Sequence, residues 1–124
     1  MPTTRRIVTV CAVIFAASCS GSGSDVTGTT STDTFGGSAT ATLVSVTMPN
    51  LVYNPNHIDI ARNGVVNFVF SSIAHDVRFG GNAQAPNDIL VTSNTTVSRT
   101  FTNAGTFTFL CTLHANMTGV VVVH

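Results

Sequence analysis

Apolar and polar side chains alternate in short runs between residue 39 and the C-terminus, and turn residues separate one run from the next. Short runs rich in Val, Thr and Phe are typical of β-strands. The runs are residues 41–47, 57–60, 65–70, 75–79, 89–91, 96–102, 106–111 and 119–123. None of them has the periodicity of an amphipathic helix. About eight strands in such a span predict an all-β domain, a Greek-key β-sandwich of two sheets.

Two of these runs carry further information. The run 65–70 is almost continuously apolar, which predicts a strand buried on both faces or at the centre of the sandwich. In the run 106–111, Phe107, Phe109 and Cys111 share a parity, so their side chains lie on one face of the strand. If that face is the core, Cys111 also points inward, at the end of its strand.

The segment Cys111–Met117 contains a thiol, an imidazole and a thioether, the last two from His114 and Met117. A second imidazole, His75, lies upstream. Two His, one Cys and one weakly bound Met form the ligand set of a blue-copper electron-transfer site, because sulfur favours Cu(I) and imidazole accepts both oxidation states. A zinc site would usually contain more Cys, His or carboxylate ligands instead of Met. Taken alone, Cys111 would equally suit a buried, inert thiol, but the spacing of its neighbours favours a metal ligand.

The remaining histidines have no such neighbours. His57 lies in an apparent edge strand, and we expect it to be structural or exposed. His124 ends the sequence, where fraying is common. The adjacent His75 and Asp76 resemble the acid–base pair of a hydrolase, but neighbouring residues of a strand point to opposite faces. We therefore expect that the protein is not an enzyme.

Residues 1–19 have the features of a secretory signal peptide. Arg5 and Arg6 precede an apolar run over residues 7–17, which is too short for a membrane-spanning helix of ~20 residues. The segment Phe15–Cys19 resembles the lipobox of bacterial lipoproteins, in which the Cys is lipidated and becomes the first mature residue. The resemblance implies that Cys19 carries a lipid anchor to a membrane. The alternative is a plain signal peptide, cleaved near position 17 or later.

Residues 20–38 are rich in Ser, Gly and Thr. Such a composition buries too little apolar surface to offset the entropy of ordering, so we expect a flexible linker. The alternative is that its end forms the first edge of the fold. The folded domain would then occupy residues 39–124. With Cys11 in the signal peptide and Cys19 lipidated, Cys111 is the one thiol of that domain, and it has no partner for a disulfide.

The charge of the chain argues against a nucleic-acid partner. The sequence has five Arg, five Asp and no Lys. Two of the arginines belong to the signal peptide, so residues 20–124 carry 3 − 5 = −2 with histidines neutral. They contain no basic patch of the kind that binds phosphates.

The span from about residue 40 to the C-terminus resembles the cupredoxins, the small blue-copper proteins. The residues that carry the resemblance are 54–60, 64–68, His75, 101–111, His114, Met117 and 119–122. The spacing Cys-x2-His-x2-Met matches the short ligand loop of amicyanin-like members, whereas plastocyanins have a longer interval between His and Met.

This resemblance implies one copper ion that cycles between Cu(II) and Cu(I). His75, Cys111 and His114 would be its strong equatorial ligands, and Met117 the long axial one. It also implies a monomeric carrier of single electrons, which docks transiently with donor and acceptor redox proteins. Because of the signal-like residues 1–19, we expect the protein to be exported to the periplasmic or extracellular face of a membrane. The alternative is a copper-binding carrier or storage protein without a role in electron transfer.

In such proteins the second His lies near the surface, beside an apolar docking patch. Candidates for that patch here are Met48, Pro49, Leu113 and Ala115.

The sequence departs from the cupredoxins at Asp76, where the family commonly has Asn. That residue ties its strand to the ligand loop, and Thr112 could donate its hydroxyl or its amide to the carboxylate. We predict that ionised Asp76 stabilises Cu(II) and lowers the reduction potential relative to Asn. The alternative is that Asp76 faces solvent and has little effect.

Overall fold

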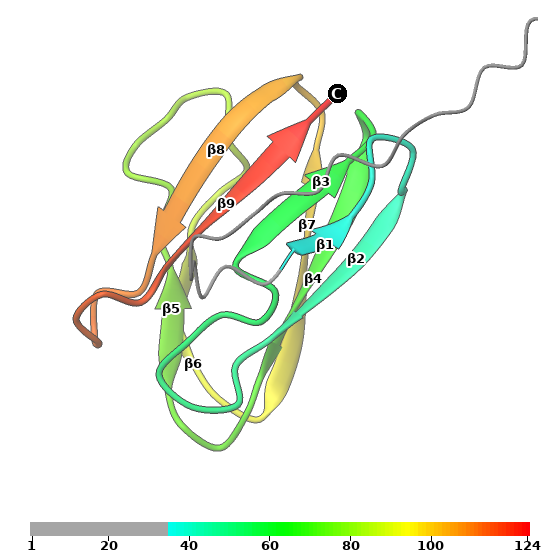
Figure 1. Cartoon of the computed structure of the whole chain (residues 1–124). Coiled ribbons are helices and arrows are strands. Elements are labelled where there is room, and N and C mark those ends of the chain that lie inside the picture. Colours follow the sequence, from blue (N-terminus) through cyan, green and yellow to red (C-terminus); the bar gives the residue numbers. More distant parts are fainter. Residues whose placement is uncertain (1–34) are drawn as a thin grey trace, which may run out of the picture. The chain divides into compact units, whose positions relative to one another are not determined.

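The computed structural model describes residues 35–124, which form nine β-strands joined by loops and turns (Figure 1). They are β1 (Phe35–Gly37), β2 (Leu43–Thr47), β3 (His57–Ile60), β4 (Gly64–Phe70), β5 (His75–Val77), β6 (Ile89–Thr92), β7 (Thr95–Phe101), β8 (Gly105–Leu110) and β9 (Thr118–Val123). These residues contain no helix, and so none that is long and apolar enough to cross a membrane. The all-β prediction is confirmed, with every predicted run overlapping a strand.

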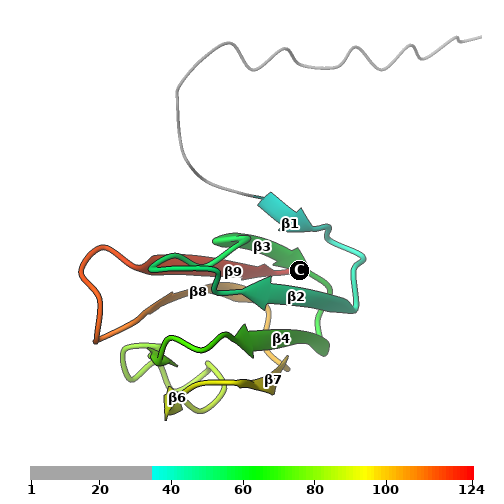
Figure 2. The same ribbon diagram turned by 90° about the horizontal axis from the view of Figure 1, so that it is seen from below.

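The strands form two main sheets and a short ribbon. One sheet has the order β1-β3-β9-β8, the other β2-β4-β7, and β5 pairs with β6. Pairing is parallel for β1–β3, β3–β9 and β2–β4, and antiparallel for β4–β7, β8–β9 and β5–β6. Figure 2 shows β3 and β9 in one layer with β4 and β7 on the other side of the sandwich. The structure is therefore the two-sheet sandwich that the alternating pattern predicts.

The core lies between the inner faces of the two sheets. Phe109 of β8 is at its centre and packs edge-on against Phe68 of β4 and Tyr53 of the loop before β3. Strand β4 alternates between buried and half-buried positions and is the central strand of its sheet. Of the two alternatives for the run 65–70, the strand at the centre of the sandwich therefore holds, and burial on both faces does not. The outward positions Val65 and Val69 are apolar because Val suits a pleated, half-buried surface.

Strand β1 lies within the range 20–38, whose composition predicts a linker, and it pairs with β3. The fold thus begins at the end of that range, as in the alternative interpretation. Because β3 pairs with β1 on one side and β9 on the other, it is an inner strand, and the prediction of an edge strand is wrong. Gly36 permits this pairing, because a Cβ there would collide with the ring of Pro55. A strand with two glycines has little apolar pattern by which the sequence could reveal it. Residues 1–34, including Cys19, lie outside the described part of the chain.

Candidate metal centre

The candidate ligands come from two places that lie close together at one end of the sandwich. His75 is the first residue of β5, and Cys111 follows the last residue of β8. His114 lies in the loop between β8 and β9, and Met117 directly precedes β9. The antiparallel hairpin of β8 and β9 therefore places three of the four residues in one short loop.

Hydrogen bonds close this loop, residues 111–117, which we call the ligand loop. The Cys111 N–H donates to the Met117 carbonyl at 3.0 Å, and the Met117 N–H donates to the His114 carbonyl at 3.4 Å. Asn116 has a φ of 62°, a left-handed conformation that Asn tolerates better than most residues. The backbone itself thus holds the relative positions of the loop residues.

A pair of backbone hydrogen bonds brings His75 to the ligand loop. The Arg78 N–H donates to the Leu110 carbonyl at 2.9 Å, and the Leu110 N–H donates to the Arg78 carbonyl at 3.0 Å. This bridge joins the segment after β5 to the last residue of β8. Because Leu110 immediately precedes Cys111, the bridge places His75 and Cys111 on neighbouring segments although 36 positions separate them.

The donor atoms of His75, Cys111 and His114 lie within 4.8 Å of one another. The Cys111 Sγ is 3.9 Å from Nδ1 of His75 and 3.5 Å from Nδ1 of His114. Nitrogen and sulfur donors that bind one transition-metal ion at about 2.0–2.3 Å stand roughly 3.5–4 Å apart in a trigonal arrangement. These three residues therefore fit a single metal ion.

Burial differs between the candidate ligands. The side chains of His75, Cys111 and Met117 are almost fully buried, whereas His114 is partly exposed. Burial lowers the pKa of His75, and His114 lowers it further, while the backbone of Asn50 and the Asp76 carboxylate act in the opposite direction. A neutral imidazole is the form that binds a metal ion. The site thus has an interior side and one side that meets the surface at His114.

Comparison with known proteins agrees with this donor set. Residues 40–124 match the model of the family described as copper binding proteins, plastocyanin/azurin family. The chain belongs to this family. Its cofactor is one copper ion, and it is a cupredoxin. No curated protein sequence matches the chain.

Solved structures of amicyanin variants are similar to this cupredoxin. A reduced Cu(I) form at pH 4 is 27% identical, with a TM-score of 0.58 over 65% of this chain and 81% of that one. Another reduced variant is 26% identical, with a TM-score of 0.59 over 67% and 83%. A Cu-containing nitrite reductase from Thermus scotoductus is 25% identical, with a TM-score of 0.53 over 65% of this chain and 22% of that one.

Asp76 of the cupredoxin is fully buried, which excludes the alternative that it faces solvent. Both Thr112 groups named from the sequence donate to it: the backbone N–H to Oδ1 at 2.7 Å and the hydroxyl to Oδ2 at 2.6 Å. Burial opposes ionisation, but hydrogen bonds from Thr112, Arg78 and Cys111 outweigh it and lower the pKa of Asp76 to about 2. The carboxylate is therefore ionised at neutral pH beside two of the candidate ligands.

Two residues that the sequence analysis does not single out also contact Asp76. The Arg78 Nε–H donates to its Oδ2 at 2.9 Å, and the Tyr53 hydroxyl donates to its backbone carbonyl at 2.6 Å. Asp76 and Arg78 are two positions apart on an extended segment, so their side chains lie on the same face. This spacing is a signal that could have predicted their contact. The sequence holds no comparable signal for Tyr53, which comes from a loop 23 positions earlier.

Exposed apolar side chains lie on the segments around the candidate ligands of the cupredoxin. Leu113 is 48% exposed, and Pro49 and Ala115 are also exposed. Met48 is 1% exposed, so its predicted place in a surface patch is wrong, because the side chain belongs to the core. Leu51, Val52 and Ile73 are exposed instead, on loops that precede His75.

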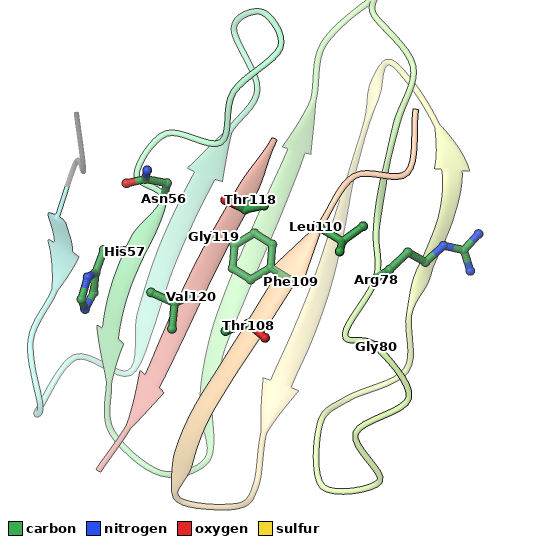
Figure 3. Close-up of a pocket in the computed structure, with 10 residues that line it drawn as sticks. All are labelled: Asn56, His57, Arg78, Gly80, Thr108, Phe109, Leu110, Thr118, Gly119 and Val120. Atoms are coloured by element: carbon green, nitrogen blue, oxygen red, sulfur yellow. The ribbon is translucent and has the colours of Figure 1, made fainter. Parts of the chain in front are cut away.

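The other histidines lie outside the ligand set. His57 packs against the ring of Phe35, with ring centroids 4.8 Å apart. His57 also lines an open groove of about 480 Å³ on the outer face of β3, β9 and β8 (Figure 3). His124 is held by backbone hydrogen bonds to Ile60 and Arg62, so the expected fraying of the last residue is wrong.

Proposed function

We propose that the protein is an electron carrier that moves single electrons between redox proteins. Bound copper would supply a one-electron couple, Cu(II)/Cu(I), and the residues around it would hold the ion in reach of a donor and an acceptor protein. The observation that carries this proposal is the convergence of His75, Cys111 and His114 within 4.8 Å, with one of the two imidazoles partly exposed.

The ligand assignment follows from the chemistry of the donors. His75, Cys111 and His114 would hold copper as strong ligands, and Met117 as a weak fourth ligand. The hydrogen bonds within the ligand loop and the bridge between Arg78 and Leu110 support donors that keep their places in both oxidation states. A site preorganised in this way needs little rearrangement on gain or loss of an electron.

The docking surface that we propose is the apolar end of the molecule around His114. The exposed side chains there are Pro49, Leu51, Val52, Ile73, Leu113 and Ala115. Encounters between redox proteins typically bury less than ~1,200 Å² and are transient. We expect a monomer whose partners are donor and acceptor proteins, and no nucleic-acid partner.

We also propose that the protein is exported and held by a lipid on Cys19 at the periplasmic or extracellular face of a membrane. The support is the signal-like pattern of residues 1–19. Mass spectrometry of the full-length protein extracted from membranes tests this proposal. A diacylated N-terminal Cys19 would support it, with Cys19→Ser as the unlipidated control. A mature chain that begins beyond position 19 would contradict it.

The alternative function is copper carriage or storage. A carrier that releases its ion gains little from a buried thiolate. Cys111 is only 4% exposed, which favours the electron carrier over this alternative. We propose no catalytic role, although a nitrite reductase is among the similar structures. That enzyme is much longer, and the similarity covers 22% of it.

Visible and electron paramagnetic resonance spectra of the chain without residues 1–19, loaded with Cu(II), test the function. We expect an intense blue band, a narrow copper hyperfine splitting and reversible bleaching by a reductant. Cys111→Ser should remove the band and leave the fold intact. A pale wild-type product would contradict the blue-copper site, and a blue product with very slow electron self-exchange would favour the carrier or storage function.

A further inference from the structure

Arg78 is linked to both residues that flank Cys111, to Leu110 directly and to Thr112 through Asp76. Its backbone pairs with Leu110 through two hydrogen bonds of 2.9 Å and 3.0 Å. Its side chain reaches Thr112 through Asp76, because Asp76 Oδ2 accepts both the Nε–H of Arg78 and the hydroxyl of Thr112. One residue therefore holds the segments on either side of the thiolate ligand that we propose.

The Asp76 carboxylate depends on a cation. Its side chain is fully buried, and a buried carboxylate without a counter-charge is strongly destabilising. Among residues 35–124, Arg78 is the one basic side chain within ion-pair distance of it. Without Arg78, the same carboxylate would be uncompensated next to His75.

A second carboxylate fixes the guanidinium. Oδ2 of Asp88 lies 3.5 Å from Nη1 of Arg78, and Oδ1 of Asp88 accepts the backbone N–H of Phe79 at 2.8 Å. The Arg78 side chain keeps 31% exposure at the rim of the outer groove, where Figure 3 shows it beside Leu110 and directed away from the sheet. Arg78 can therefore be replaced without opening the core.

We propose that Arg78 is a positioning residue for the copper site: it holds the Asp76 carboxylate against Thr112 and offsets its charge, which keeps the reduction potential higher than Asp76 alone would set it. This inference rests on the proposed function only in its use of a copper potential. Its structural part, the ordering of the ligand loop through Asp76, also applies to the metal-free protein.

The test compares Arg78→Gln with Arg62→Gln in the purified protein. The Arg62 side chain donates to the Thr102 carbonyl, and its backbone N–H donates to His124, directly after the last residue of β9. The ligand loop lies at the opposite end of β9, before its first residue. Both variants thus lose one positive charge, but only Arg78→Gln loses the contact with Asp76. We expect a lower reduction potential for Arg78→Gln, little change for Arg62→Gln, and a much smaller effect of Arg78→Gln in an Asp76→Asn background.

The second readout needs no copper. In the metal-free protein, Arg78→Gln should speed hydrogen exchange of the Thr112 amide about tenfold, because Arg78 then no longer holds the carboxylate that accepts this amide. A potential no lower than that of Arg62→Gln, or an equal shift in the Asp76→Asn background, would overturn the proposal. If the protein forms no blue site, the proposed function fails, and unchanged Thr112 exchange would then by itself overturn the role of Arg78.

Discussion

The Asp76 carboxylate accepts two hydrogen bonds from Thr112, one from its backbone at 2.7 Å and one from its hydroxyl at 2.6 Å. The pair joins the strand of His75 to the ligand loop directly after Cys111. Because Asp76 is ionised and buried, this connection also places a negative charge beside the copper site.

Asp76→Asn should therefore raise the reduction potential, because loss of the negative charge destabilises Cu(II) more than Cu(I). Voltammetry of the copper protein at pH 7 measures this shift. Asp59→Asn is the matched control, since it removes the same charge from β3, where the carboxylate pairs with His124 and contacts neither Asp76 nor Arg78. An unchanged or lower potential for Asp76→Asn would show that the carboxylate does not tune copper.

Stability of the metal-free protein should fall in acid because of the same carboxylate. The pKa of Asp76 is about 2 in the fold, below the usual value of about 3.9. Its contribution is thus complete above about pH 4 and is lost as the pH falls through about 2. We expect it to amount to roughly 1–2 kcal/mol, allowing for screening near the partly exposed Arg78.

Denaturant unfolding between pH 5 and 2 measures this loss. Asp76→Asn should flatten the pH dependence over that range, whereas Asp59→Asn on the outer face of β3 should keep most of it. Parallel curves for the wild type and Asp76→Asn would contradict the assignment to Asp76.

Tyr53→Phe should lower the free energy of unfolding by about 1–3 kcal/mol, because it leaves the buried Asp76 carbonyl without the hydroxyl donor. The aromatic ring that packs on Phe109 is retained, so the effect isolates the hydrogen bond. Ser98→Ala, which removes an exposed hydroxyl bonded to Asn67, is the control and should cost less than about 0.5 kcal/mol. Equal costs for the two variants would contradict a structural role of the Tyr53 hydroxyl.

Met117→Leu should raise the reduction potential and preserve the blue band, because it removes a weak thioether donor and keeps the equatorial ligands. The change nearly conserves volume, so it should cost less than about 1.5 kcal/mol of stability. Met48→Leu, at the other buried Met of the domain, is the matched control. If the two variants shift the potential equally, Met117 is a packing residue instead of a ligand.

Gly119→Ala should destabilise the β8–β9 hairpin that carries the ligand loop. A Cβ at this position would collide with the Phe109 ring and lie 2.9 Å from the Asn56 carbonyl oxygen. Overpacking of this kind costs about 1–3 kcal/mol, measurable by thermal unfolding. Thr118→Ala, at the neighbouring exposed position, should have little effect. A stable Gly119→Ala variant would mean that Phe109 moves aside at low cost.

Much of the fold could be predicted because the alternation of residues along a strand is a local property. The parity of Phe107, Phe109 and Cys111 places all three in the core, and all three are buried. The spacing within residues 111–117 identifies the loop. Ligation by Met117 stays a prediction, since the family match and the three-residue donor cluster do not test it.

The rest required the tertiary structure. Strand β1 forms only because β3 offers it an edge, and its own glycines give no pattern. Whether Asp76 would face solvent or the interior depended on the segments packed over β5, and its charge is tolerated because Arg78 and Thr112 meet there. The sequence by itself determined which side chains can bind copper, since ligand chemistry belongs to residue types and their spacing. Only the packing of distant segments decided the charge, the hydrogen bonds and the exposure around those side chains.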